Sequence, residues 1–371
     1  MKKFFLLFFL FYSLFILNSY AVNIDSCQVL GAGSYTLNQS LTHSGSTCFS
    51  FSSPNVILDC QGYNLSISAT SYGIQSSSLN VTIKNCNIYG GVQTGIYVIS
   101  TNTNSIINNS IYNSRFGISL FTADNNIISQ NVIVNASPSG VGIDLYSSSY
   151  NSIINNTIIN SDGDGIEIDS AFTGEFNEII NNTITSATLN GIEIDDITST
   201  STKIIGNEIS NSGTGISVAS SNTNITNNVI TGNTNGIFLG GLTYGVNHTT
   251  IFNNTITGNE NYNIGFLSFD LTINTSIYAN HLGDISKVYN NDWSNWQINF
   301  NSSSIGNTYY NTSGLGSGLT YCFDSPTNSI CDYFATIIAF PEIIQATSSE
   351  SFFSFSSFLI PLIMVFMYFI L

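Results

Sequence analysis

The sequence of 371 residues predicts an all-β fold, a right-handed parallel β-helix of about nine to eleven coils. The first observation is a Gly-Ile step that recurs every 21 to 27 residues, and the second is an IxxNxI motif that recurs between the steps. The third is that no apolar stripe of helical spacing joins them. The step occurs at Gly73, Gly95, Gly117, Gly142, Gly165, Gly191, Gly215 and Gly236, with Asn263 as a degenerate copy. One interval accommodates three short strands and their turns, so each is expected to form one coil.

The Asn of the IxxNxI motif occurs once in every interval. These residues are Asn109, Asn131, Asn156, Asn182, Asn207, Asn228, Asn254 and Asn280. Asn tolerates the left-handed conformation of a tight turn, and stacked Asn amides can hydrogen-bond from coil to coil. A ligand-binding ladder of amides is the alternative interpretation. The Gly before each inward Ile is expected to permit a bend at a corner of the coil.

Both ends of the chain predict export and membrane attachment. Lys2 and Lys3, an apolar run and the small residues Ser19 and Ala21 are typical of a secretory signal, although an uncleaved anchor is an alternative. The last 20 residues are uncharged and long enough to cross a bilayer, although a tail exchanged for a lipid has a similar sequence. We therefore expect a signal peptide at 1–21, an N-terminal cap at 22–53, repeats at 54–283, a C-terminal cap at 284–340, a linker at 341–351 and a membrane anchor at 352–371.

The composition excludes nucleic acid as a partner. Removal of the signal leaves four basic residues against 22 acidic ones, and phosphate binding needs Lys and Arg. Six cysteines in an exported chain predict disulfides. Cys60 and Cys86 stand about one coil apart at matching places, and local pairing of the others gives Cys27–Cys48, Cys60–Cys86 and Cys322–Cys331.

Segments near both caps resemble a known family, the NosD-like β-helix proteins, including archaeal surface members. The resembling segments are NVILDCQG at 55–62, VTIKNC at 81–86, GNTYY at 306–310, CFD at 322–324 and ICD at 330–332. The resemblance covers roughly residues 27 to 340. The family name implies copper handling, but three Met and three His in no cluster give copper no soft site.

Candidate site residues lie in an acidic region, because ten of the 22 acidic residues fall between Asp162 and Glu208. Stacking of the coils predicts two vertical files of outward carboxylates. The expected members are Asp144, Glu167 and Glu193 in one file and Asp169 and Asp195 in the other. Tyr97 and Phe238 share the first file. The carboxylates suit a calcium-type site, a catalytic pair of a glycoside hydrolase or lyase, or a solvated acidic face.

We therefore predict a membrane-anchored cell-surface scaffold that presents a face to glycans or other surface proteins. A polysaccharide-active enzyme is the alternative, although the sequence names no catalytic residue and no cofactor other than possible calcium. Thirteen NxS/T sequons make glycosylation chemically possible in an exported chain.

Overall fold

The computed structural model describes residues 21–68, 72–90, 93–170, 174–196, 201–240, 246–266 and 275–283, together with the backbone of six short strands between 288 and 339. None of these residues is helical, so within them no helix is long and apolar enough to cross a membrane. The expected membrane anchor and linker, and the expected signal peptide apart from Ala21, lie outside the described residues.

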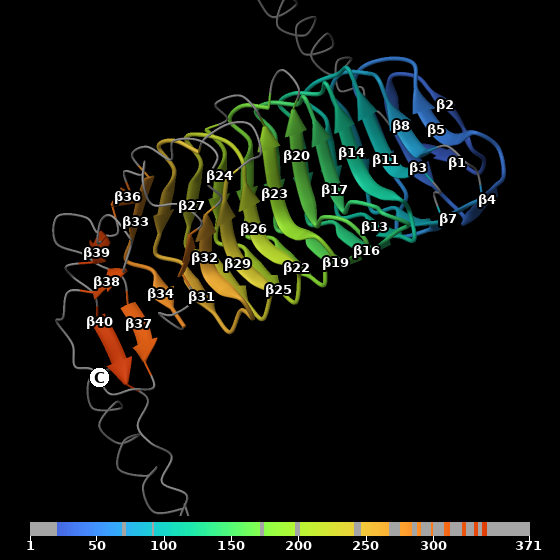
Figure 1. Cartoon of the computed structure of the whole chain (residues 1–371). Helices are drawn as coiled ribbons and strands as arrows, with labels where there is room; N and C mark the ends of the chain where they lie inside the picture. Colours follow the sequence, from blue (N-terminus) through green and yellow to red (C-terminus); the bar gives the residue numbers. More distant parts are fainter. Residues whose placement is uncertain are drawn as a thin grey trace, which may run out of the picture. The chain divides into compact units, whose positions relative to one another are not determined.

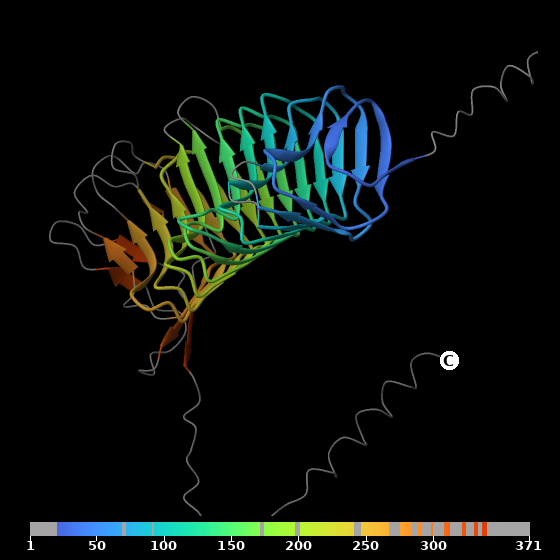
Figure 2. The same cartoon turned by 90° about the vertical axis from the view of Figure 1, so that its right-hand side faces the viewer.

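The described chain is a parallel β-solenoid of about ten coils, which confirms the predicted all-β class. Each coil contributes one strand in turn to three parallel sheets, here called sheet 1, sheet 2 and sheet 3. Figures 1 and 2 show the strands of successive coils stacked side by side in each sheet.

The strand bounds are as follows. Sheet 1 contains β1 (Val22–Ile24), β3 (Gly33–Leu37), β6 (Val56–Asp59), β9 (Val81–Lys84), β12 (Ser105–Ile107), β15 (Ile127–Ser129), β18 (Ser152–Ile154), β21 (Glu178–Ile180), β24 (Lys203–Ile205), β27 (Asn224–Thr226), β30 (Thr250–Phe252), β33 (Thr275–Tyr278) and β36 (Ile298–Asn299). Sheet 2 contains β4 (Leu41–His43), β7 (Asn64–Ile67), β10 (Asn87–Tyr89), β13 (Ser110–Tyr112), β16 (Val132–Ala136), β19 (Thr157–Ser161), β22 (Thr183–Thr185), β25 (Glu208–Ser210), β28 (Val229–Thr231), β31 (Thr255–Thr257), β34 (His281–Leu282), β37 (Thr308–Asn311) and β40 (Thr336–Ala339). Sheet 3 contains β2 (Gln28–Leu30), β5 (Thr47–Phe51), β8 (Tyr72–Ser76), β11 (Thr94–Ile99), β14 (Phe116–Phe121), β17 (Ile143–Tyr146), β20 (Ile166–Ser170), β23 (Asn190–Asp196), β26 (Thr214–Val218), β29 (Asn235–Leu239), β32 (Tyr262–Phe266) and β35 (Val288–Asn290). An antiparallel pair, β38 (Tyr321–Phe323) and β39 (Ile330–Asp332), stands outside the three sheets.

The core is a set of aliphatic columns, because the repeat places the same inward residue at the same point of each coil. In sheet 1, for example, Ile153 pairs with Ile179, and Ile179 pairs with Ile204. All three are fully buried, whereas Thr183 of β22 is exposed. The inward and outward positions of the strands therefore follow the predicted alternation.

A buried asparagine ladder runs along the corner between sheets 1 and 2. The backbone N–H of Asn156 donates to Oδ1 of Asn182 at 2.8 Å, and its side-chain amide donates to the same oxygen at 3.0 Å. That amide also donates to the carbonyl of Ile128 at 2.9 Å. This pattern confirms the predicted coil-to-coil amide bonds. Because Asn156 and Asn182 are 1 % exposed, the alternative of a ligand-binding ladder is wrong.

We expected the ladder Asn to adopt the left-handed conformation of the turn. The residue before it does so instead. Asn155 has φ 55° and Asn181 has φ 54°, and both are exposed. Two adjacent residues therefore divide the roles that the sequence suggested for one. The first makes the turn and the second satisfies buried polar groups of the backbone.

The Gly of the Gly-Ile step does not serve as a corner hinge either. A Cβ on Gly165 would lie 2.5 Å from the carbonyl oxygen of Gly191 and 2.5 Å from Cγ2 of Ile184. No φ in the left-handed range accompanies it. Glycine is required here because the coils approach closely, and the bend expected from the sequence is not the reason.

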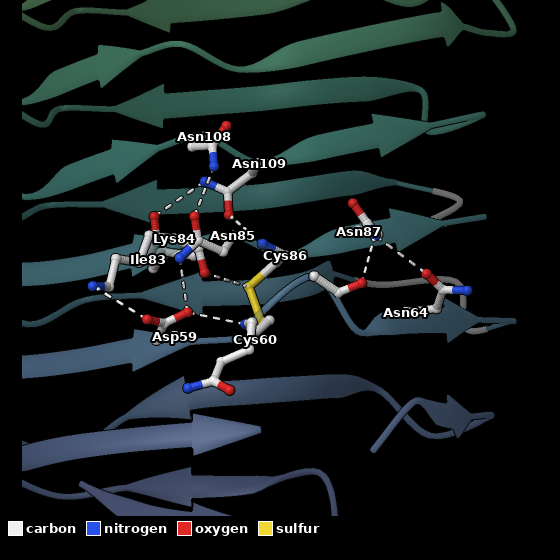
Figure 3. Close-up of a disulfide and its surroundings, with 12 residues drawn as sticks. Asp59, Cys60, Asn64, Ile83, Lys84, Asn85, Cys86, Asn87, Asn108 and Asn109 are labelled. Atoms are coloured by element: carbon white, nitrogen blue, oxygen red, sulfur yellow. Dashed lines mark hydrogen bonds and ion pairs between the residues drawn. A yellow bond between two sulfur atoms is a disulfide. The ribbon is translucent and has the colours of Figure 1, made fainter. Parts of the chain in front are cut away.

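The disulfides Cys27–Cys48 and Cys60–Cys86 are present, as predicted, with Cα–Cα distances of 4.5 and 4.7 Å. Cys86 occupies the place of a ladder residue, since its N–H donates to Oδ1 of Asn109 at 3.0 Å. Figure 3 shows this corner, where the Cys60–Cys86 disulfide replaces the amide hydrogen bonds of the ladder.

Beside this disulfide, Asp59 lies 3.2 Å from Nζ of Lys84 and accepts a hydrogen bond from the side-chain amide of Asn85 (Figure 3). Although burial alone would raise the pKa of Asp59, the hydrogen bonds from Asn85, Gln61 and Lys84 lower it below its usual value. The carboxylate therefore stays charged and ties the two coils together.

The segments expected to cap the solenoid also contain strands of the three sheets. β1 to β5, within 22–53, pair in the same parallel sheets although they lack both sequence motifs. Within 284–340, β35, β36, β37 and β40 join the sheets. The pairing of β38 with β39 sets Cys322 opposite Cys331, but their side chains lie outside the described residues, so the third disulfide stays a prediction.

Candidate functional site

The outward face of sheet 3 carries the candidate site. The strand pairing aligns one residue from each coil in a continuous file along this sheet. In chain order the file, here called the first file, is Gln75, Tyr97, Ser119, Asp144, Glu167, Glu193, Ser217, Phe238 and Gly265. Neighbouring members stand one strand spacing apart, ~4.8 Å. The expected alignment of Asp144, Glu167 and Glu193 is therefore present.

A second file runs beside the first one. It contains Phe121, Tyr146, Asp169 and Asp195, again in strand register. Asp169 is partly buried and Asp195 is exposed. All five predicted site residues therefore lie on one face, and the two aspartates of the second file are at its edge toward the corner between sheets 3 and 1.

Three carboxyl groups converge where β20 begins. One oxygen each of Asp164, Glu167 and Glu193 lies within 4.8 Å of the others. Asp164 is 4 % exposed and accepts a hydrogen bond from the backbone N–H of Asn190 at 2.7 Å. Glu167 and Glu193 are half-buried. We call Asp164, Glu167 and Glu193 the carboxyl cluster.

Burial and mutual repulsion keep protons on the cluster. Burial, followed by the negative charges of Asp144, Asp164 and Glu193, raises the pKa of Glu167 to about 8. Burial also raises the pKa of Glu193 to about 7, with the charge of Asp164 and a hydrogen bond to it among the further causes. At neutral pH the cluster therefore holds both proton donors and acceptors.

The neighbouring Asp144 follows the same trend. Burial raises the pKa of Asp144 to about 6, although Ser119 Oγ donates a hydrogen bond of 2.7 Å to it. The ion pairs found within the described residues, Asp59–Lys84 and Glu178–Lys203, do not involve the first file. No basic side chain is among the causes of these shifts, so burial and carboxylate repulsion are not offset by a cation.

Aromatic rings flank the carboxyl cluster on both sides along the first file. Tyr97 stacks on Tyr72 with ring centroids 4.6 Å apart, three strands before Glu167. Phe238 lies two strands after Glu193, with its ring centroid 6.2 Å from that of Tyr262. The pKa of Tyr97 is raised, first by burial and then by the charges around it.

Sequence reasoning missed Asp164 as a site residue. It precedes Gly165 of the Gly-Ile step, a position that the other coils fill with neutral residues. These are Tyr72, Thr94, Phe116, Val141, Asn190, Thr214, Asn235 and Tyr262. A comparison of this one position along the repeat would have singled out the only acidic residue in it.

Comparison with known proteins places this architecture in a family. The family model described as periplasmic copper-binding protein (NosD) matches residues 22–224, more than half of the chain. The chain belongs to this family. No curated protein sequence matches the chain.

Solved structures share the fold at low sequence identity. The A-module of the mannuronan C-5 epimerase AlgE6 from Azotobacter vinelandii matches with a TM-score of 0.56 and 15 % identity over 76 % of this chain and 80 % of that one. A periplasmic alginate epimerase, AlgG, matches at 0.54 and 13 % over 68 % and 76 %. PfbA, a surface adhesin of Streptococcus pneumoniae, matches at 0.51 and 13 % over 82 % and 90 %. At these identities the likeness shows the fold alone.

The residues present do not suit the copper that the family description names. Within the described residues, the group of three potential ligands is the carboxyl cluster, which offers only oxygen. Copper prefers imidazole, thiolate or thioether ligands. Four of the six cysteines are in disulfides, and the three histidines do not gather in a group of three potential metal ligands within these residues. An all-oxygen set suits a hard cation such as Ca²⁺ instead.

Proposed function

We propose that this protein is an exported surface scaffold that binds a neutral polysaccharide along the outward face of sheet 3. The observation that carries the proposal is the first file, in which carboxyl groups occupy the middle and an aromatic ring lies on each side of them. Disulfides in the N-terminal coils are consistent with export.

The chemistry of the file suits sugar rings. Tyr and Phe offer flat apolar surfaces to the C–H face of a pyranose, and Tyr adds a hydroxyl that can hydrogen-bond. Carboxyl groups accept hydrogen bonds from sugar hydroxyls, and a protonated Glu167 also donates. Because the members are aligned across strands, the bound chain is expected to run along the stack of coils.

The charge of the face argues for a neutral polymer. At neutral pH Asp144, whose pKa is about 6, is largely ionised and repels a uronate chain, and no described basic side chain of the first file offsets its charge. In this respect the chain is proposed to differ from the epimerases of mannuronan and alginate that share its fold. The adhesin among the similar structures shows that the fold also occurs in surface proteins.

A glycoside hydrolase is the second candidate, and one observation favours it. Oxygens of Glu167 and Glu193 lie within 4.8 Å of each other, close to the ~5 Å separation between the carboxyl groups of retaining enzymes. With a pKa of about 8, Glu167 is protonated at neutral pH, as a general acid must be. In this scheme Glu193 or Asp164 is the nucleophile. Release of reducing sugar that is lost in Glu167→Gln tests it.

Calcium at the carboxyl cluster is compatible with the scaffold function and excludes the hydrolase scheme, in which Glu167 must hold a proton. We propose Glu167 and Glu193 as the central ligands of such a site, with Asp164 as a third ligand. The other residues predicted from the sequence lie around these ligands and are Asp144, Asp169 and Asp195. A bound cation would relieve the repulsion and hold the carboxylates for sugar hydroxyls. Attachment to the membrane through residues 352–371 is likewise proposed from the sequence.

A glycan array with the purified protein tests the proposal. We expect binding to neutral polysaccharides and none to polyuronates. Tyr97→Ala, on the first file, is expected to weaken that binding, whereas Tyr112→Ala, a stacked tyrosine of sheet 2, is the matched control and should not. Equal loss in both variants, or binding to polyuronates only, would contradict the assignment of the face.

A further inference from the structure

A second pair of aromatic residues projects from the corner between sheets 3 and 1. The rings of Tyr150 and Phe176 stack with centroids 5.0 Å apart and planes 14° from parallel. Tyr150 is 53 % exposed and Phe176 is 45 % exposed. The pair lies outside the first file and outside the carboxyl cluster.

Both residues adopt a backbone conformation that their side chains disfavour. Tyr150 has φ 58° and Phe176 has φ 57°, in the left-handed region. Small polar residues, Asn above all, occupy this region more readily than bulky ones. Corresponding turn positions of other coils are filled by Asn80, Thr103, Asn125, Ser201, Asn222 and His248, all with positive φ.

The turn itself does not require aromatic side chains. The backbone N–H of Tyr150 donates to the carbonyl of Glu175 at 2.9 Å, and that of Asn125 donates to the carbonyl of Ser149 at 3.0 Å. The same turn thus forms with Asn one coil earlier. A second set of buried asparagines stacks at this corner, between sheets 3 and 1. Each turn precedes one of them, Asn126 or Asn151, which anchors the turn by donating its own N–H to Oδ1 of the Asn in the next coil. Folding alone gives no reason for exposed rings here.

We propose that Tyr150 and Phe176 form a stacking platform for a pyranose ring of a polysaccharide, a second subsite of the binding surface. The inference rests on the function proposed above and extends it around the corner of the coil. Bulky residues in a disfavoured conformation are often retained for function. Stacked rings present broad apolar faces, and the carboxyl groups of Glu175 and Asp124, each one residue before a turn position, offer acceptors for sugar hydroxyls nearby.

The Tyr89–Tyr112 pair in sheet 2 supplies a matched control. Its rings also stack, with centroids 4.7 Å apart, and Tyr89 is 38 % exposed. Both residues, however, lie in β10 and β13, where aromatic residues are intrinsically favoured and their presence needs no ligand.

The test is affinity electrophoresis of the purified protein through gels that contain a neutral glucan that the array shows to bind. The double variant Tyr150→Asn with Phe176→Asn is expected to bind roughly three- to tenfold more weakly. Its melting temperature should be equal to the parent's or higher, because Asn suits the left-handed turn. Tyr89→Ser with Tyr112→Ser should bind as the parent does.

Three outcomes distinguish this inference from the proposed function. Unchanged binding of the double variant, with weakened binding of Tyr97→Ala, overturns the platform and leaves the sheet 3 face standing. A lower melting temperature with unchanged binding assigns the pair to structure only and also overturns it. Absence of binding by the parent to every neutral polysaccharide on the array overturns both proposals.

Discussion

The sequence repeats more regularly from coil to coil at the corner between sheets 1 and 2 than on the outward face of sheet 3. At the corner, the inward Ile of sheet 1 and that of sheet 2 are five residues apart in coil after coil, as in Ile106 and Ile111 or Ile179 and Ile184. From sheet 3 to sheet 1 the corresponding spacing varies between nine residues, Ile216 to Ile225, and 14 residues, Ile237 to Ile251. Both corners contain buried amides that bond from coil to coil, and each amide keeps its distance from the inward Ile that follows it, as in Asn151 and Ile153. The extra residues between sheets 3 and 1 precede the amide.

The face of sheet 3 is under no such constraint. Its outward residues change from tyrosine to serine, carboxylate and phenylalanine within one file, while the inward columns behind them stay aliphatic. Hydrogen bonding and packing thus account for what is repeated. The outward residues of sheet 3 vary while the scaffold behind them is constant, so this face is where a ligand can be recognised.

The largest expected effect breaks the scaffold. Ile179→Asp places an unpaired carboxylate in a dry column and is expected to lower the free energy of unfolding by about 3–5 kcal/mol. Thr183→Asp, at an exposed position, should cost far less. Denaturant titration measures both. Equal losses would show that the inward and outward assignments are wrong.

The next effect tests the two adjacent asparagines at the corner. Asn182→Ala removes the acceptor for the backbone N–H of Asn156 and leaves buried groups unsatisfied, at a cost of about 2–4 kcal/mol in unfolding free energy. Asn181→Gly keeps the left-handed turn and should change stability by less than about 1 kcal/mol. The reverse order of the two losses would contradict the division of roles.

Calcium probes the face instead of the corner. Millimolar calcium is expected to raise the melting temperature, by the equivalent of about 2.7 kcal/mol at a hundredfold excess over Kd. Glu167→Gln with Glu193→Gln should remove most of the rise, whereas Glu208→Gln, exposed on sheet 2, should retain it. No change in melting temperature with calcium would contradict the proposed calcium site at the carboxyl cluster.

A smaller effect is the pH dependence of stability without added metal. Because the pKa of Glu167 rises from 4.5 to about 8 on folding, the native state holds more protons than the unfolded state between these values. Stability should therefore fall as the pH rises from about 5 to 8. Glu167→Gln should flatten this slope in thermal melts at several pH values. If stability depends on pH as steeply in the variant as in the parent, groups other than Glu167 are responsible for the dependence.

Much of the fold was predictable from the sequence because each coil needs the same buried residues. The isoleucine columns, two disulfides and the alignment of Asp144 with Glu167 followed from spacing alone. The physical reasons for the repeated Gly and Asn positions could not be predicted from the sequence. The close approach that excludes a Cβ at Gly165 and the division of roles between Asn181 and Asn182 depend on coordinates of the neighbouring coil.

The site was predictable only in part. Outward alignment follows from the strand period, so the two files could be expected. Asp164 does not follow from that period, since it lies in the turn before β20, and only a comparison of the residue before each Gly of the repeat would have singled it out. The Tyr150–Phe176 pair also depends on turn geometry, which the strand period does not fix.

Hydroxyl-radical footprinting with bound neutral glucan tests whether the outward face of sheet 3 binds the polysaccharide, because it reports the solvent accessibility of individual aromatic side chains. We expect Tyr97, Tyr146 and Phe238 on sheet 3 to become protected, while Tyr89 and Tyr112 on sheet 2 react as in the free protein. Protection of the sheet 2 tyrosines, with sheet 3 unchanged, would contradict binding on sheet 3.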